Sequence, residues 1–309
     1  MDQVLVQVPQ QIVNGITLGC VYALLALGYS MVYGVLKMLN FAHGDVFMVG
    51  AFAGWGVFSL LTRGGSPVVN ATFILAAMVL GATAATALLG AVIERLAYRP
   101  LRKGSRLAPL ISALGVSIIL QNMAMLMTSG RAKAIQTELL IPAGAGVHLG
   151  GASISVARLL IVGTSVGIML ALDSVVRRTR LGREMRATSQ DLEAAEYVGI
   201  RTSRVIVSTF IIGSGLAGVA GVMIGLYYMQ VDFTLGFSAG IKAFTAAVLG
   251  GIGNMRGAMA GGLLLGLTES LGVIVAAPVY KDAIVFTALV AALILRPAGL
   301  LGTQVRDRV

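Results

Sequence analysis

Long apolar segments separated by short polar ones make up nearly the whole chain, and this pattern limits the fold more than any other feature. A helix needs roughly 20 apolar residues to cross the hydrocarbon layer, and several segments reach or approach that length. A soluble domain could not bury them, since 57% of the residues are hydrophobic and 12% are charged. The runs are continuous rather than alternating, which argues against a β-barrel. The segments lie near 9–35, 40–61, 70–97, 107–129, 156–176, 205–229, 238–252, 256–276 and 279–296.

These segments predict the fold class and the domain organisation. We expect an all-α polytopic membrane protein, a bundle of about 8–9 transmembrane helices with broken or re-entrant segments among them. The whole chain, 1–309, then forms a single transmembrane domain. The one cysteine, Cys20, lies in an apolar segment without a partner in the chain, which excludes a disulfide framework.

Basic residues are concentrated in two loops between apolar segments, in a chain whose net charge is +10. The first loop carries Arg95, Arg99, Arg102, Lys103 and Arg106, and the second carries seven arginines from Arg177 to Arg204. Stacking aromatic residues are not interleaved with these charges, so a nucleic-acid partner is not expected. The positive-inside rule instead places both loops in the cytoplasm.

The same rule predicts the topology of the remaining segments. The stretch 131–158 should lie outside, and it is the largest external element. A cytoplasmic C-terminus is favoured by Arg296, Arg306 and Arg308, and it requires the short segment 238–252 to be a broken crossing. The N-terminus lies outside if 40–61 spans the membrane and inside if that segment re-enters, and the sequence leaves both open.

The polar segment within the second basic loop has the pattern of a docking helix. Thr188 and Asp191 fit a capping box and Gly199 suits a helix end, so a helix of about three turns is expected. An apolar stripe suited to the groove of a partner protein is formed by Leu192, Ala195 and Val198. A solvated connector between two spans is the alternative.

Two apolar segments open with similar polar, glycine-containing stretches. One is Asn40-Phe41-Ala42-His43-Gly44-Asp45 and the other is Gly253-Asn254-Met255-Arg256-Gly257, which suggests a weak internal repeat. Such interruptions at matching positions in two halves are typical of broken helices that line a substrate path. Ordinary turns are the alternative. The candidate pathway residues are Asn40, Ala42, His43, Gly44, Asp45, Gly253, Asn254 and Gly257.

Ionisable residues inside membrane segments are also functional candidates. They are Asp45, Lys242, Glu269, and Asp282 with Lys281. So few acidic groups disfavour an ion-coupled secondary transporter, which stays an alternative. Glycines four residues apart, including Gly163 and Gly167, are expected to pack helices closely.

Motifs for catalysis and metal binding are scarce. Residues 163–167 match the G-x-S-x-G pattern, but they lie in an apolar segment instead of a strand-to-helix turn. An intramembrane serine protease, with His43 or His148 as base, is therefore a remote alternative. Neither zinc-ligand spacing nor a Walker A loop is present, so no metal, cofactor or catalytic site is expected, and any ATPase must be another chain.

Three motifs together resemble one known family. Residues Glu193-Ala194-Ala195-x-x-x-Gly199 are similar to the EAA-x-x-x-G core of the cytoplasmic loop by which bacterial ABC importer permeases engage their ATPases. The stretches 179–187, 39–45 and 249–257 resemble branched-chain amino-acid permeases of the LivH type, and the likeness covers nearly the whole chain. One departure is that Ile200-Arg201-Thr202 follows Gly199 where the broader pattern has Leu-Pro.

The resemblance implies a permease subunit of the bacterial inner membrane that imports leucine, isoleucine and valine, although relatives also serve urea, short amides or other amino acids. The implied partners are a second permease subunit, related or identical, two cytoplasmic ABC ATPases that use ATP, and a periplasmic substrate-binding protein. The implied coupling loop is 177–204. Its candidate residues are Arg183, Arg186, Asp191, Glu193, Ala194, Ala195 and Gly199.

Overall fold

The computed structural model describes residues 2–62, 69–102, 107–141, 146–149, 151–296 and 298–302. Four of the basic residues used to predict topology, Lys103, Arg106, Arg306 and Arg308, lie outside these ranges.

Long helices occur at all the positions predicted from hydropathy. They are α1 (Asp2–Leu36), α2 (His43–Leu61), α3 (Ala71–Ile93), α4 (Ala108–Thr128), α5 (Val156–Arg178), α8 (Thr202–Tyr228), α9 (Leu235–Gly250), α10 (Met255–Val275) and α11 (Lys281–Leu295). Among the described residues, eight helical spans are long and apolar enough to cross a membrane, the last of them Pro278–Leu295, which joins a 3-10 turn to α11, and α9 is a shorter apolar helix. The polytopic all-α fold is therefore confirmed.

The remaining elements are short and lie near the ends of the bundle. The helices α6 (Arg180–Gln190) and α7 (Leu192–Tyr197) follow α5, and a π-helical turn, Glu94–Tyr98, extends α3. Short 3-10 turns are formed by Arg99–Leu101, Thr137–Leu139 and Pro278–Tyr280. Strand β1 (Lys133–Ala134) pairs antiparallel with β4 (Gln230–Val231), and β2 (Gly146–Leu149) forms a hairpin with β3 (Ala152–Ser155).

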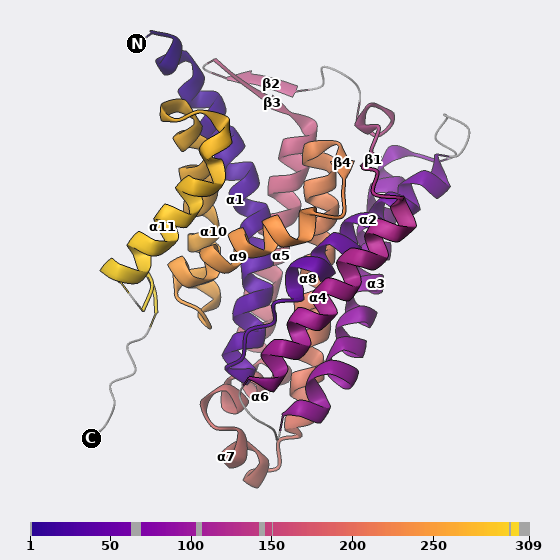
Figure 1. The fold of residues 1–309 in the computed structure, drawn as a ribbon, viewed down its shortest axis with the longest axis vertical. Helices are drawn as coiled ribbons and strands as arrows, with labels where there is room; N and C mark the ends of the chain where they lie inside the picture. The colour runs from indigo at the N-terminus through magenta and orange to yellow at the C-terminus, as the bar shows by residue number, and fades with distance from the viewer. Residues whose placement is uncertain are drawn as a thin grey trace.

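The bundle has two distinct ends (Figure 1). The start of α1 and the β2–β3 hairpin lie at one end, which we call the hairpin end, whereas α6 and α7 lie at the other, the α7 end. Helix α2 runs toward the hairpin end, where α3 begins. Segment 40–61 therefore returns the chain to the end from which α1 started, and the start of α1 lies on the same side as the stretch 131–158.

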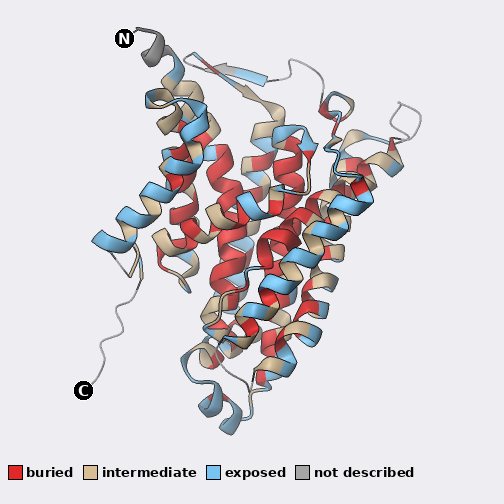
Figure 2. Ribbon diagram, viewed as in Figure 1, coloured by how far each residue is buried: buried red, intermediate tan, exposed pale blue. Residues whose placement is uncertain are grey.

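The core of the bundle is built around α1 and α8 (Figure 2). In their most apolar windows, 94% of α1 and 78% of α8 residues are buried inside the chain, compared with 11% for α4. Helices α2, α3 and α10 pack against this pair. The outer faces of α4 and α11 are exposed and apolar, which suits contact with lipid or with a partner subunit.

Glycines bring α1 and α10 into backbone contact. A Cβ atom at Gly15 would lie 2.9 Å from the Cα of Leu267, and one at Gly19 would lie 2.9 Å from the Cα of Leu263. Close packing between small residues is the main source of helix association in lipid. The same expectation is not met within this chain for Gly163 and Gly167, because a Cβ atom at either position would meet nothing within 4 Å among the described residues.

Helices α2 and α9 both begin inside the bundle. A Cβ atom at Gly28 would collide with the His43 ring, which places the start of α2 eight residues, roughly 12 Å, before the end of α1. A Cβ atom at Gly240 of α9 would lie 3.0 Å from the Cα of Gly44. The predicted broken crossing at 238–252 is thus an oblique 16-residue helix that starts beside α2.

Candidate functional site

The predicted docking segment is two helices rather than one. Thr188 belongs to α6, where its hydroxyl donates to the Glu184 carbonyl at 2.8 Å, so it does not cap a new helix. The chain turns at Asp191, whose carboxylate accepts from the Ala194 N–H at 3.0 Å and caps α7. The predicted helix of three turns is therefore wrong, and the capping residue is Asp191.

Helix α7 projects most of its side chains away from the rest of the chain. Tyr197 is 89% exposed and Val198 is 76% exposed, whereas Ala195 is 3% exposed and anchors the helix on the bundle. The expected stripe of Leu192, Ala195 and Val198 is therefore split between two faces. Glu193 and Ala194 are exposed, so they lie with Tyr197 on the surface available to a partner.

Gly199 ends this unit in the backbone conformation that the sequence predicted. Its φ is +85°, in the region that favours glycine, and its N–H donates to the Glu196 carbonyl at 2.9 Å. The Ile200 N–H then donates to the Ala195 carbonyl at 3.0 Å, and α8 begins two residues later at Thr202. This reversal fixes the direction of α7 relative to a long core helix.

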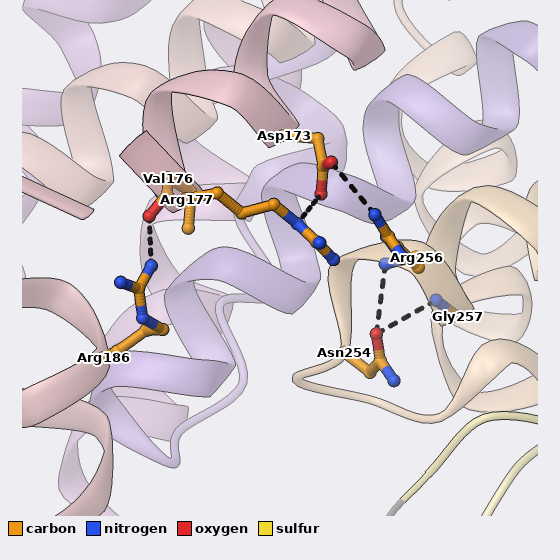
Figure 3. Close-up of polar contacts among 7 residues, drawn as sticks. All are labelled: Asp173, Val176, Arg177, Arg186, Asn254, Arg256 and Gly257. Atoms are coloured by element: carbon orange, nitrogen blue, oxygen red, sulfur yellow. Dashed lines mark hydrogen bonds and ion pairs between the residues drawn. The ribbon is translucent and has the colours of Figure 1, made fainter. Parts of the chain in front are cut away.

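Polar contacts join the basic loop to the turn between α9 and α10 (Figure 3). The Asp173 carboxylate accepts from Arg177 Nε at 2.9 Å and from Arg256 Nη2 at 3.5 Å. Arg186 donates to the Val176 carbonyl, which closes the angle between α5 and α6, and Arg183 is exposed. Asp173 was not identified from the sequence, although it is an ionisable residue within the apolar segment 156–176 and that signal could have found it.

The two Asn-containing stretches differ in structure, so the proposed internal repeat is not supported. The Asn254 carboxamide accepts from the N–H groups of Arg256 and Gly257 at 3.1 and 3.2 Å and caps α10. Asn40 caps nothing, and its Oδ1 accepts from the Tyr98 hydroxyl at 3.0 Å. A Cβ atom at Gly257 would collide with the Gly250 carbonyl, so the turn at Gly253 to Gly257 is a tightly packed connection.

The start of α2 is buried in this conformation. Ala42 is 0% exposed and His43 is 1% exposed, and the His43 ring packs edge-on against Tyr29 with centroids 4.8 Å apart. His43 Nε2 has no hydrogen-bond partner among the described residues. The expectation that these two positions line a water-filled passage is therefore not met in this state.

Asp45, two residues after His43 in the first turn of α2, borders a cavity. Its carboxylate accepts from the Ser117 hydroxyl and, at 3.1 Å, from Gln121 Nε2, both on α4. The cavity, of about 70 Å³, lies between α2, α4 and α9. Its lining residues are Tyr29, Phe41, Asp45, Leu114, Ser117, Gly236, Phe237, Gly240, Ile241 and Phe244. Asp45 forms no ion pair among the described residues, although it is only 2% exposed.

Three ionisable residues that are distant in the sequence form one network on the other side of α9. Lys242 Nζ lies 2.8 Å from Glu269 Oε1 and 3.0 Å from Asp282 Oδ1. The Tyr22 hydroxyl donates to the second Glu269 oxygen at 2.9 Å. Glu269 is 1% exposed, so its charge is balanced and hydrogen-bonded inside the bundle. The sequence identified these residues singly but could not pair them.

The G-x-S-x-G pattern does not form a nucleophile elbow. Residues 163–167 lie in the middle of α5, and the Ser165 hydroxyl is buried without a hydrogen-bond partner among the described residues. His148 lies in β2, at the hairpin end. Within the described ranges, no three His, Cys, Asp or Glu residues are grouped to hold a metal ion.

Comparisons with known proteins identify the family. Residues 11–293 match the model of the branched-chain amino acid transport system permease component. The chain is 45% identical to the high-affinity branched-chain amino acid transport system permease protein BraD of Pseudomonas aeruginosa and 42% identical to LivH of Escherichia coli, over 97% of each chain. A probable LivH of Methanocaldococcus jannaschii is 27% identical over 91% of this chain and 88% of its own length. The chain therefore belongs to the family of branched-chain amino acid transport permease components, which are transport proteins and not enzymes.

Proposed function

We propose that this chain is the transmembrane permease subunit of an ABC importer and passes leucine, isoleucine and valine across the bacterial inner membrane. The proposal is supported by the family match over residues 11–293 and by relatives whose names specify branched-chain amino acids. A related importer of urea, short amides or other amino acids is the competing assignment, because permease helices carry little of the substrate choice when a binding protein delivers the solute.

The proposed partners follow from the family. An ABC permease works in a membrane complex with ATPase and substrate-binding subunits, and here we propose two cytoplasmic ATPases, one periplasmic binding protein and a second permease chain. The chain would act as one transmembrane domain, with 177–204 as its coupling loop. The α7 end and the C-terminus would face the cytoplasm, as the arginines of α5 and α6 favour.

The exposed tip of α7 is the observation that carries the coupling mechanism. Tyr197 and Val198 project from a short helix that is fixed at one end by the Asp191 cap and at the other by Gly199. An exposed aromatic side chain on a rigid support is typical of an interface anchor. We infer that the tip inserts into a groove of the ATPase, so that movement of the ATPase moves α6 and α7 together.

This movement can reach the helices that surround the central cavity. Helix α6 is locked to α5, and Asp173 of α5 binds Arg256 at the start of α10. The tight turn containing Gly253, Asn254 and Gly257 then connects α10 to α9, which borders the cavity. We propose that ATP binding shifts this chain of contacts and rocks the bundle between outward- and inward-open states. Asn40, Ala42, His43, Gly44 and Asp45, at the start of α2, would then border the passage or its inner gate.

The test compares two exposed tyrosines at opposite ends of the molecule. The complex with its partner permease, ATPases and binding protein is purified and reconstituted in liposomes, and uptake of labelled leucine is measured against urea and other amino acids. Loss of an interface aromatic costs about 2 kcal/mol or more, so Tyr197→Ala should retain roughly 30-fold less ATPase. Tyr280→Ala, which removes a 58% exposed tyrosine beside α11, is the matched control and should retain ATPase normally. Equal ATPase retention by both variants would refute docking through α7, and uptake of urea but not leucine would refute the substrate.

A further inference from the structure

The cavity beside Asp45 combines a buried carboxylate with an aromatic and aliphatic lining. Tyr29, Phe41, Phe237 and Phe244 supply the aromatic surface, and Phe244 lies 6.3 Å from the Tyr29 ring and 6.2 Å from the Phe41 ring between centroids. Aromatic faces and a carboxylate both attract organic cations, whereas an apolar lining excludes strongly hydrated ions. A volume of about 70 Å³ holds a few water molecules, which is the scale of an ammonium group with a short aliphatic chain.

The charge of Asp45 has no internal counterpart among the described residues. Glu269, the other fully buried carboxylate near α9, is neutralised by Lys242 at 2.8 Å. Asp45 instead accepts hydrogen bonds from the uncharged Ser117 and Gln121. Buried charges in membrane proteins are usually paired, so an unpaired one marks a position where a cation binds transiently.

The surroundings of Asp45 leave room for its carboxylate beside two helix starts. A Cβ atom at Gly236, in the first turn of α9, would lie 2.7 Å from Asp45 Oδ1, so only a glycine leaves room for the carboxylate there. Asp45 itself lies in the first turn of α2. The starts of two helices therefore lie beside one carboxylate, where their dipoles offset part of the cost of burying a charge.

We propose that Asp45 and this cavity form a transit site for the ammonium group of the imported amino acid, with the aliphatic side chain against Phe237 and Ile241. The inference rests on the proposed function for the substrate class, and it adds the residue that contacts the substrate. Selection at this site acts on the ammonium group and the apolar chain, so amines without a carboxylate also bind.

The test uses the purified complex in nanodiscs and three ligands that share one isobutyl chain. Saturation-transfer NMR measures the binding of leucine, of isoamylamine, which lacks the carboxylate, and of isocaproate, which lacks the amine. Leucine and isoamylamine should bind and isocaproate should not. Asp45→Asn keeps the shape of the side chain and removes the charge, so it should weaken isoamylamine binding at least about tenfold. Asp282→Asn makes the same change at a paired carboxylate beyond α9 and is expected to leave binding unchanged.

Two results would overturn the inference. One is binding of isocaproate as strong as that of isoamylamine, and the other is unchanged binding of isoamylamine to Asp45→Asn. Leucine uptake and ATPase retention by the wild-type complex are measured in parallel, with the same complex reconstituted in liposomes. If both persist while the amine fails to bind, the transit site is wrong and the importer assignment stands; if uptake of leucine is also absent, the importer assignment fails with it.

Discussion

The network of Lys242, Glu269 and Tyr22 makes a sharp prediction about stability. Among the described residues, replacing Lys242 by Met leaves the Glu269 carboxylate, which is 1% exposed, with the Tyr22 hydroxyl at 2.9 Å as its one remaining partner. Removing one partner of a buried ion pair costs about 3–5 kcal/mol. Replacing Glu269 by Gln is milder, about 1–2 kcal/mol, because Lys242 keeps Asp282 at 3.0 Å and the amide keeps a hydrogen bond to Tyr22.

The free-energy costs of the two substitutions should not add in the double variant. With Lys242→Met and Glu269→Gln together, no charge is left uncompensated at position 269, so the double variant should be more stable than Lys242→Met alone by about 2 kcal/mol. Two destabilising changes would thus partly cancel. That outcome follows only if the cost of Lys242→Met arises from an unpaired buried charge and not from lost packing of the lysine stem.

The single cysteine of the chain provides the assay. Cys20 is 1% exposed in α1, two residues from Tyr22, so a thiol-reactive fluorophore reports unfolding of this part of the bundle during heating. A loss of 3–5 kcal/mol should lower the midpoint by roughly 10 °C for Lys242→Met, with a smaller drop for Glu269→Gln. Lys281→Met, at the start of the neighbouring helix α11, serves as the control and should shift little. A double variant that melts below Lys242→Met would refute the argument.

Three further outcomes are expected. Gly199→Val should cost about 1–2 kcal/mol at φ +85° and retain several-fold less ATPase in pull-down assays, whereas Gly199→Asn, which tolerates this conformation, should be nearly normal. Gly262→Leu should prevent recovery of folded protein by size-exclusion chromatography, because its side chain would strike the backbone of Ala23. In a cysteine-free background without nucleotide, Val198→Cys should label with an impermeant thiol reagent in inside-out vesicles while Ala42→Cys stays unlabelled.

The positions of the membrane helices could be predicted from sequence because hydropathy is a local property. A run of apolar residues avoids water whatever its neighbours are. Apart from the start of α1 at Asp2, the predicted segments coincide with the helices within a few residues. The depth at which a helix begins is not local. The interior starts of α2 and α9 depend on the approach of Gly44 to Gly240, between residues almost 200 positions apart.

The docking segment illustrates a different limit. A Thr followed three residues later by an acidic residue is compatible with a cap, but Thr188 already lies in a helix that began at Arg180. A motif of four residues does not show whether those residues already belong to a longer helix. Here the Thr188 hydroxyl, which was expected to cap a new helix, donates to the Glu184 carbonyl of α6 instead. Gly199 was predictable because a positive φ at a helix end favours glycine whatever surrounds it.

The interior start of α2 connects the fold with the chemistry of the cavity. A full crossing would place the first turn of α2, and Asp45 with it, at a membrane surface where a carboxylate is unremarkable. Starting α2 beside Gly28 brings that carboxylate into the bundle, where it is tolerated because two helix starts and two polar side chains of α4 surround it. These groups offset part of the cost of burying the charge without pairing it with a cation. A bundle selected for stability alone would carry a neutral residue here, so Asp45→Asn should melt at or above the wild-type temperature while leucine uptake falls. If the variant instead melts well below wild type, the Asp45 carboxylate stabilises the fold. Its burial would then not be explained by binding of a cation during transport.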